Sequence, residues 1–221
     1  MAEDVHQQGI GTRTGVKLHP ASSLSVRIGE VFNSSPTVAN GVVYVGSTDL
    51  AVHALSGSTG TQLWGYTTGG WVDSSPAVAN GVVYVGSWDG NLYALNAGTG
   101  ALLWSYATGN VDSSPAVTNG VVYVGSYDGD IYALNVSTGA LLWSYTTGNY
   151  VESSPAVANG VVYIGSIAGN VCALNASTGA LLWSYFPDGG VASSPTVANG
   201  VLYVGSMDGK VYAFDLKKGQ E

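Results

Sequence analysis

Residues 74–106 read SSPAVANGVVYVGSWDGNLYALNAGTGALLWSY, and this stretch decides the fold. Runs of β-branched and aromatic residues alternate in it with Asn-Gly, Asp-Gly and Gly-Thr-Gly, which are typical turn sequences. The pattern predicts four short antiparallel strands, at residues 74–80, 81–87, 91–96 and 101–106. The middle strands are apolar almost throughout, which indicates a sheet that is buried on both faces.

The chain contains five copies of this stretch, including the one quoted. Its Ser-Ser-Pro motif begins at Ser34, Ser74, Ser113, Ser153 and Ser193, so 39 or 40 residues separate successive copies. A period near forty residues with four strands in each period is typical of the blades of a β-propeller. We therefore predict an all-β fold, a five-bladed β-propeller of four-stranded antiparallel blades. Proline cannot donate a ladder hydrogen bond, so the first strand, in which we place the prolines, is expected to be the innermost edge of each blade.

The fifth copy ends at Glu221, before the position of its fourth strand. Residues 22–28 match that strand, because Leu24 lies ten residues before Ser34 as Trp143 lies ten residues before Ser153. We expect residues 22–28 to pair with residues 212–216 and to close the ring, which removes the free sheet edges. The expected protein is a monomer, and exchange of this strand between two chains is the alternative. A flexible tail is expected at residues 1–20 and one propeller domain at 21–221.

Composition limits the classes of partner. The formal net charge is −8, and the six Lys and Arg residues form no basic patch, which argues against a nucleic-acid partner. The sequence has no apolar run of membrane-spanning length, and we expect no membrane partner. The polar residues 1–8 lack the features of a signal peptide, so the expected protein is either cytoplasmic or a processed exported domain.

The stretch Ala94-Leu95-Asn96, Thr99-Gly100 and Trp104 recurs at residues 133–143 and 173–183. It resembles the tryptophan-docking motif of the PQQ-like (pyrroloquinoline-quinone-type) β-propeller repeat family, and the resemblance covers residues 22–221. It implies that the fourth-strand tryptophans dock onto the neighbouring blade. These are Trp64, Trp104, Trp143 and Trp183. The family includes PQQ-dependent alcohol dehydrogenases, the barrel-assembly lipoprotein of the bacterial outer membrane and sensor domains of bacterial kinases. Most members have seven or eight blades, whereas five are counted here.

The resemblance also implies what a quinone-dependent enzyme would need: a disulfide between adjacent cysteines and a calcium site with catalytic carboxylates. Cys172 is the only cysteine, and it occupies a third-strand packing position that other copies fill with Tyr93, Tyr132, Tyr212 or His53. Two of the three histidines, His6 and His19, lie in the expected tail. We therefore expect no catalytic residue, no metal and no cofactor, and a protein that is not an enzyme.

The copies differ from one another mainly at one end of the blades, which we call the top face. It consists of the loops that enter the first strands and the loops that join the second strands to the third. Exposed aromatic residues and carboxylates gather there, and such groups mark contact surfaces. The predicted partner- or ligand-binding residues are Trp71, Trp88, Tyr127, Tyr150, Asp73, Asp112 and Glu152.

Other acidic residues of the top face have a structural explanation. Asp49, Asp89, Asp128 and Asp208 occupy turns, where aspartate bonds its own backbone. For Asp73, Asp112 and Glu152 the structural and functional interpretations stay open. The function predicted is a non-catalytic binding or scaffold module that presents the top face to a protein or peptide partner, with a negative field that favours basic segments. One alternative is a small-ligand or glycan-binding (lectin-like or sensor) propeller, with sugars stacked on Trp71 and Trp88. Another is a recently amplified or designed repeat scaffold without an evolved ligand.

Overall fold

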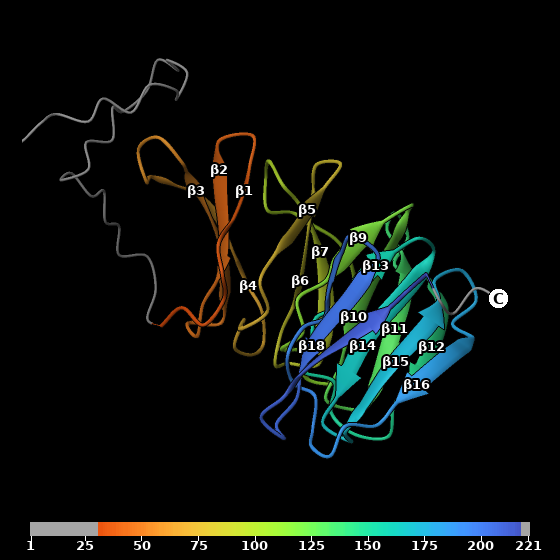
Figure 1. Ribbon diagram of the computed structural model, residues 1–221. Helices are drawn as coiled ribbons and strands as arrows, with labels where there is room; N and C mark the ends of the chain where they lie inside the picture. Colours follow the sequence, from red (N-terminus) through yellow and green to blue (C-terminus); the bar gives the residue numbers. More distant parts are fainter. Residues whose placement is uncertain (1–30, 218–221) are drawn as a thin grey trace, which may run out of the picture.

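The computed structural model describes residues 31–217. Over this range the chain forms nineteen strands in five antiparallel sheets and contains no helix, so none that could span a membrane. The sheets stand side by side in chain order around an arc (Figure 1). Each sheet is one predicted blade, and the order of its strands in space follows the sequence.

The strand bounds repeat from sheet to sheet. Sheet 1 contains β1 (Thr37–Ala39), β2 (Val42–Gly46), β3 (Ala51–Ser56) and β4 (Gln62–Thr67). Sheet 2 contains β5 (Ala77–Ala79), β6 (Val82–Gly86), β7 (Asn91–Asn96) and β8 (Leu102–Ala107). Sheet 3 contains β9 (Ala116–Thr118), β10 (Val121–Gly125), β11 (Asp130–Asn135) and β12 (Leu141–Thr146). Sheet 4 contains β13 (Ala156–Ala158), β14 (Val161–Ser166), β15 (Asn170–Asn175) and β16 (Leu181–Tyr185). Sheet 5 contains β17 (Thr196–Ala198), β18 (Val201–Gly205) and β19 (Val211–Asp215).

The turn between the first two strands of sheet 2 has the predicted type. Asn80 and Gly81 both have positive φ, 50° and 77°, as a type I′ hairpin requires. The same pair of angles recurs at the Asn-Gly turn of every sheet. This turn fixes the register in which Ala77 faces Tyr84 and Ala79 faces Val82. The local sequence therefore sets the alignment of each hairpin.

The first strand is shorter than predicted. It begins at Ala77, whereas the sequence suggested residues 74–80, and Pro76 lies directly before it rather than within it. The reason is that Ser74 and Ser75 use their hydroxyl groups in place of a ladder. The Ser74 hydroxyl accepts a bond from Gly86 N within the sheet (3.1 Å), and the Ser75 hydroxyl accepts one from Ser35 N of sheet 1 (2.8 Å). The first strand does lie at the sheet edge, as expected.

The second serine of the motif links successive sheets. Its backbone N–H donates to the corresponding hydroxyl of the next sheet at 2.8–3.0 Å, along the series Ser35, Ser75, Ser114, Ser154 and Ser194. Sequence reasoning missed this role and explained only the proline. The Ser-Ser-Pro motif therefore holds the inner edges of the five sheets together.

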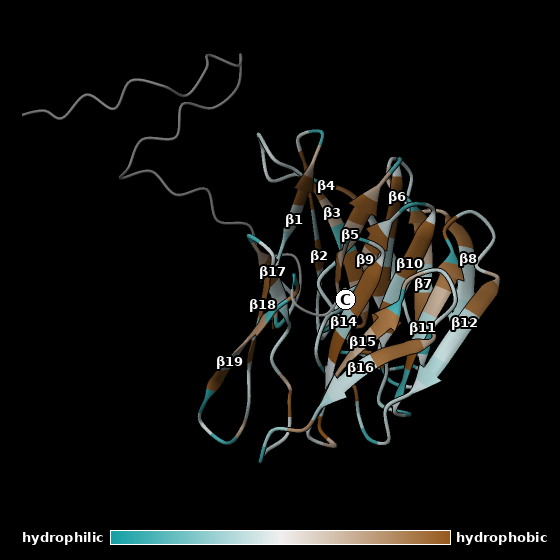
Figure 2. Ribbon diagram, turned by 45° about the vertical axis from the view of Figure 1, so that its right-hand side comes forward, coloured by the Kyte–Doolittle hydropathy of each residue, from teal (hydrophilic) through white to brown (hydrophobic). Residues whose placement is uncertain are grey.

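The core lies between the sheets. Four apolar clusters join sheets 1 and 2, 2 and 3, 3 and 4, and 4 and 5. Figure 2 shows the hydrophobic residues concentrated along the strands. In sheets 1 to 4, a glycine at the end of the second strand, or one residue before it, receives a valine from the segment that enters the next sheet. A Cβ on Gly125 would lie 2.3 Å from Val151 Cγ1, so only glycine permits this packing.

Three of the fourth-strand tryptophans bond across these interfaces. Trp64, Trp104 and Trp143 donate Nε1–H to the carbonyl oxygens of Ala97, Val136 and Ala176 in the next sheet, at 2.9–3.0 Å. The rings lie against glycines of that sheet, where a Cβ would approach them to 2.7 Å. Trp183 packs against Phe214 of sheet 5, with ring centroids 5.4 Å apart.

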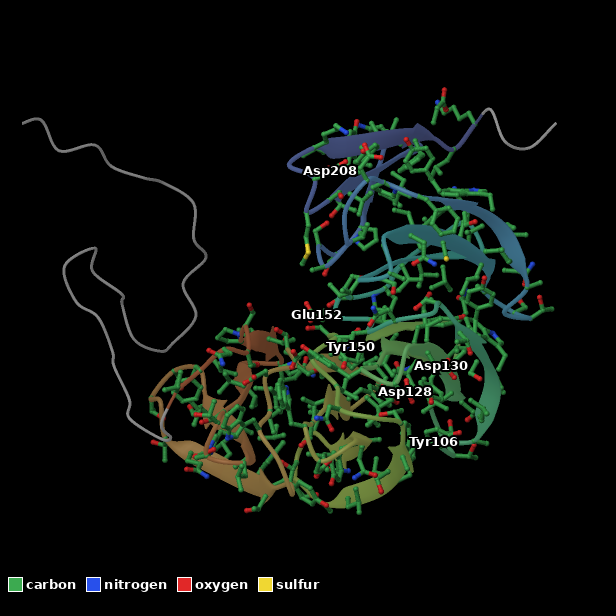
Figure 3. The ribbon with its side chains drawn as sticks, turned by 90° about the horizontal axis from the view of Figure 1, so that it is seen from below. Tyr106, Asp128, Asp130, Tyr150, Glu152 and Asp208 are labelled. Carbon is green, nitrogen blue, oxygen red and sulfur yellow. The ribbon has the colours of Figure 1, made fainter. Side chains whose placement is uncertain are left out.

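Sheet 5 has three strands in the described part of the chain. The predicted fourth strand (residues 22–28) and the predicted tail (residues 1–20) lie outside the described residues. No apolar cluster of residues 31–217 joins sheet 5 to sheet 1. Seen from below in Figure 3, the sheets form an arc with these two at its ends. Five blade-like sheets are thus observed, and closure of the ring remains a prediction.

Candidate binding face

Backbone hydrogen bonds between the two loops at the top of each blade assemble the top face. Trp88 N donates to Trp71 O (2.8 Å), and Ile167 N donates to Tyr150 O (3.0 Å). Tyr127 N makes the same bond to Asn110 O (2.9 Å). Each bond ties the loop after the second strand of one sheet to the segment that enters that sheet. The two sets of loops that make up the top face are therefore neighbours in space.

Four of the predicted residues form one aromatic ladder, in the order Trp71, Trp88, Tyr127 and Tyr150. Consecutive ring centroids are 5.6, 5.6 and 5.0 Å apart. Such separations are within the range of favourable aromatic pairs. The end residues Trp71 and Tyr150 are each 49% exposed, while Trp88 and Tyr127 are half-buried. The sequence suggested four exposed rings, and the structure presents two rings supported by two others.

Carboxylates fix the two inner rings. Trp88 Nε1–H donates to Asp112, and the Tyr127 hydroxyl donates to Asp112 Oδ2 (2.6 Å) and contacts Glu152 Oε1 (3.1 Å). Burial raises the pKa of Tyr127 far above its usual value, and both carboxylates add to the rise. The phenol therefore stays protonated and donates. Figure 3 shows Glu152 and Tyr150 on the inner side of the arc.

Asp73 continues the row of carboxylates towards sheet 1. Its Oδ1 accepts a bond from Asn33 Nδ2 (3.3 Å). Burial raises the pKa of Asp73; the Asn33 bond lowers it, and the charge of Asp112 raises it further. Within residues 31–217 the only Lys or Arg side chains are those of Lys210 and Lys217, and Lys210 pairs with Asp188 and Asp208 of the last top loops. The structure thus brings all seven predicted residues together, without a cation among them.

The turn aspartates have the structural role that the sequence suggested, and a second one that it missed. Asp89, Asp128 and Asp208 accept a hydrogen bond from the third-strand tyrosine four residues later, at 2.5–2.7 Å. In sheet 1 the pair is Asp49 and His53, 3.0 Å apart. In sheet 4 both partners are replaced, by Ala168 and Cys172. The donor and the acceptor are therefore both absent from sheet 4. A comparison of the five repeats in the sequence could have shown that these two positions change together.

This covariation gives a prediction. Cys172→Tyr alone buries part of a phenol without its acceptor, whereas Cys172→Tyr with Ala168→Asp restores the bond seen at Tyr132. We expect a favourable coupling free energy of about 0.5–3 kcal/mol between the two changes. Urea unfolding of the wild type, both single variants and the double variant measures it. Additive effects of the two changes would contradict the assignment.

The thiol of Cys172 does not belong to the aromatic ladder; it is buried in the apolar cluster between sheets 3 and 4. Burial raises the pKa of the Cys172 thiol to about 11, so it is a packing group rather than a nucleophile. No group of three or more His, Cys, Asp or Glu side chains in the described range is arranged to hold a metal ion.

Comparison with protein families matches residues 24–221 to the family described as "Beta-alanine-activating enzyme, beta-propeller". The chain belongs to this beta-propeller family. The match and the similar solved structures also confirm the PQQ-like repeats that the tryptophan motif predicted. Comparison with curated protein sequences gives no match.

Three solved structures illustrate the range of this propeller fold. BamB from Moraxella catarrhalis superposes with a TM-score of 0.76 and 23% identity, over 85% of this chain and 59% of that one. The quinohemoprotein alcohol dehydrogenase ADHIIG from Pseudomonas putida HK5 gives 0.73 and 21%, over 88% and 42%. A europium-containing methanol dehydrogenase gives 0.71 and 18%, over 84% and 49%. The propeller chain thus spans roughly half of each structure. At these identities the likeness shows the fold alone, which serves both dehydrogenases and BamB.

Proposed function

We propose that this propeller is a non-catalytic binding scaffold whose top face contacts a protein or peptide partner through a basic segment. The observation that carries the proposal is the aromatic ladder with carboxylates along it. Trp71 and Tyr150 are large, half-exposed rings, and exposed aromatic groups of this kind mark contact surfaces. Trp88 and Tyr127 hold them in place through ring contacts, so little conformational freedom is lost on binding.

The charges of the face favour a cationic partner. A carboxylate can accept about four hydrogen bonds, and Asp112 and Glu152 use only some of these sites. An arginine or lysine side chain can contact the face of a tryptophan ring and a nearby carboxylate at once. The net charge of −8 adds a longer-range attraction for basic segments. The Tyr127 phenol stays protonated, so within the ladder it acts as a hydrogen-bond donor.

A glycan or another small ligand is the second candidate, because an exposed tryptophan ring such as Trp71 also suits a sugar. The two candidates differ in their dependence on salt. Contacts between charged groups weaken as ionic strength rises, while stacking of a neutral sugar does not depend on charge.

For the fold, we further propose that residues 22–28 supply the fourth strand of sheet 5, paired with β19. The match of the family from residue 24 supports this, since it extends the propeller repeat to the segment before sheet 1. The strand can come from the same chain, which closes a five-bladed ring, or from another copy.

The binding proposal is tested by titrating the protein with a fluorescent arginine-glycine repeat peptide. Trp71→Ala and Tyr150→Ala are each expected to weaken binding by about 2 kcal/mol, which is about 30-fold. Met207→Ala is the matched control, because this side chain is 64% exposed on the top loop of sheet 5, away from the ladder. It should leave the affinity unchanged. Equal loss in all three variants would contradict the assignment.

Salt and pH provide a second readout. Affinity for the peptide should fall as salt rises, and a glycan that binds without salt dependence would favour the second candidate. A bound cation favours the ionised form of Asp73, whose pKa is raised in the free protein. The affinity should therefore decrease as the pH falls through that raised pKa. Asp73→Asn should remove this part of the pH dependence.

A further inference from the structure

Every sheet has two different faces. In sheet 2, Tyr84, Leu92 and Ala94 point to one side, which we call the tyrosine face. Val78, Val83 and Leu95 point to the other side, the valine face. In all four interfaces the tyrosine face of one sheet packs against the valine face of the next. The interface is therefore directional and runs head to tail along the arc.

Among residues 31–217, the two ends of the arc carry one face of each kind that no other sheet covers. On the tyrosine face of sheet 5, Tyr203 is 43% exposed and Val211 is 77% exposed. Their counterparts in sheet 4, Tyr163 and Val171, are 4% and 0% exposed. On the valine face of sheet 1, Val38 is 66% exposed, while Val45 and His53 of the same face are each 5% exposed. Each end thus exposes apolar side chains at positions that are buried or packed against a neighbour in the interior sheets.

We propose that the tyrosine face of sheet 5 binds the valine face of sheet 1 of a second copy of this chain. The four interfaces between neighbouring sheets show what a tyrosine face packs against, which is the apolar valine face of another sheet. The sheet 1 of the same chain lies at the other end of the arc (Figure 3). The arc superposes over 84–88% of its length on parts of longer chains, with TM-scores of 0.71–0.76. Its sheet-to-sheet geometry is therefore suited to continue into further sheets.

Polar groups at the inner edge support the same continuation. The serine series runs from Ser35 to Ser194, each N–H donating to the next hydroxyl. Continued into a second copy, it would have Ser194 N donate to the Ser35 hydroxyl of that copy. The contact is head to tail, so each pair of joined copies leaves one end face on each copy free for a further copy. The interface does not involve the top face and is independent of the proposed binding function.

Light scattering coupled to size exclusion tests the proposal on the 221-residue chain over a dilution series. We expect a mass of two or more copies at high concentration. Val211→Asp and Val38→Asp should each reduce it to one copy, because either change places a carboxylate in every end-to-end contact. Leu142→Asp is the matched control, since Leu142 is 50% exposed on the outer strand of sheet 3. It should leave the mass unchanged.

Mixing the two variants makes the test directional. Chains with Val211→Asp keep an intact sheet 1, and chains with Val38→Asp keep an intact sheet 5. Each variant alone should be a monomer, and an equal mixture should form a dimer of one copy of each. A wild type that stays monomeric at all concentrations would overturn the proposal and favour closure within one chain. Failure of the mixture to associate would also overturn it.

Discussion

Replacing Trp143 with alanine is expected to lower the free energy of unfolding by about 3–5 kcal/mol. Trp143 is 8% exposed, its Nε1–H donates to Ala176 O at 3.0 Å, and its ring lies 5.7 Å from that of Tyr123. The ring also lies against Gly179, where a Cβ would approach it to 2.7 Å. Alanine leaves a cavity between sheets 3 and 4 that these rigid neighbours cannot fill. Urea denaturation followed by circular dichroism measures the loss.

Two variants show which part of the tryptophan is responsible. Trp143→Phe keeps an apolar ring and removes the N–H donor, so it should cost less than Trp143→Ala. Trp71→Ala also removes a tryptophan, but one on the top face that is 49% exposed. It should change the free energy of unfolding by no more than about 0.5 kcal/mol. Equal losses at Trp143 and Trp71 would show that docking between sheets is not what distinguishes them.

Gly125→Ala is expected to destabilise the fold by about 1–3 kcal/mol. The added Cβ would lie 2.3 Å from Val151 Cγ1 and 2.9 Å from the Val151 carbonyl oxygen. The second contact involves backbone, which cannot move aside without separating sheets 3 and 4. A thermal or urea melt measures the change.

Gly98→Ala is the matched control for that prediction. Its Cβ would meet only Asn96 Oδ1, at 3.5 Å. The other copies carry a larger residue at this position, namely Ser58, Ser137 and Ser177. The substitution should therefore be neutral or slightly stabilising, since alanine restricts the unfolded chain more than glycine does. Comparable losses at Gly98 and Gly125 would contradict the role assigned to close sheet packing.

The sequence predicted the elements that depend on neighbouring residues. Asn80-Gly81 adopts the expected turn, and the third strand of sheet 2 has the predicted bounds, Asn91–Asn96. The shorter first strand was missed because the Ser74 and Ser75 hydroxyls compete with the backbone ladder, which no strand propensity records. The paired loss of Asp and Tyr at Ala168 and Cys172 was present in the sequence, but its meaning required the hydrogen bond at Asp128 and Tyr132.

The candidate site was predicted as a set of residues and not as an arrangement. Differences between the copies identified Trp71, Trp88, Tyr127 and Tyr150. Positions that vary among the repeats on one face of the fold are not constrained by the packing between sheets, whereas the invariant positions are. Which rings are exposed depends on the rotation between sheets. That rotation places Asp112 against both Trp88 and Tyr127 and leaves Trp71 and Tyr150 at the ends.

By itself, then, the sequence determined the number of sheets, the order of their strands, the hairpin turns and the family, because these follow from a local pattern repeated every 39 or 40 residues. Only the tertiary structure decided the aromatic ladder, the serine series from Ser35 to Ser194 and the two unpaired end faces. The ladder and the serine series join residues of different copies, often 39 or 40 positions apart, and an end face is one on which no other described sheet packs. Contacts at that separation are set by how one sheet packs on the next, and the strand and turn pattern within one copy does not specify that packing.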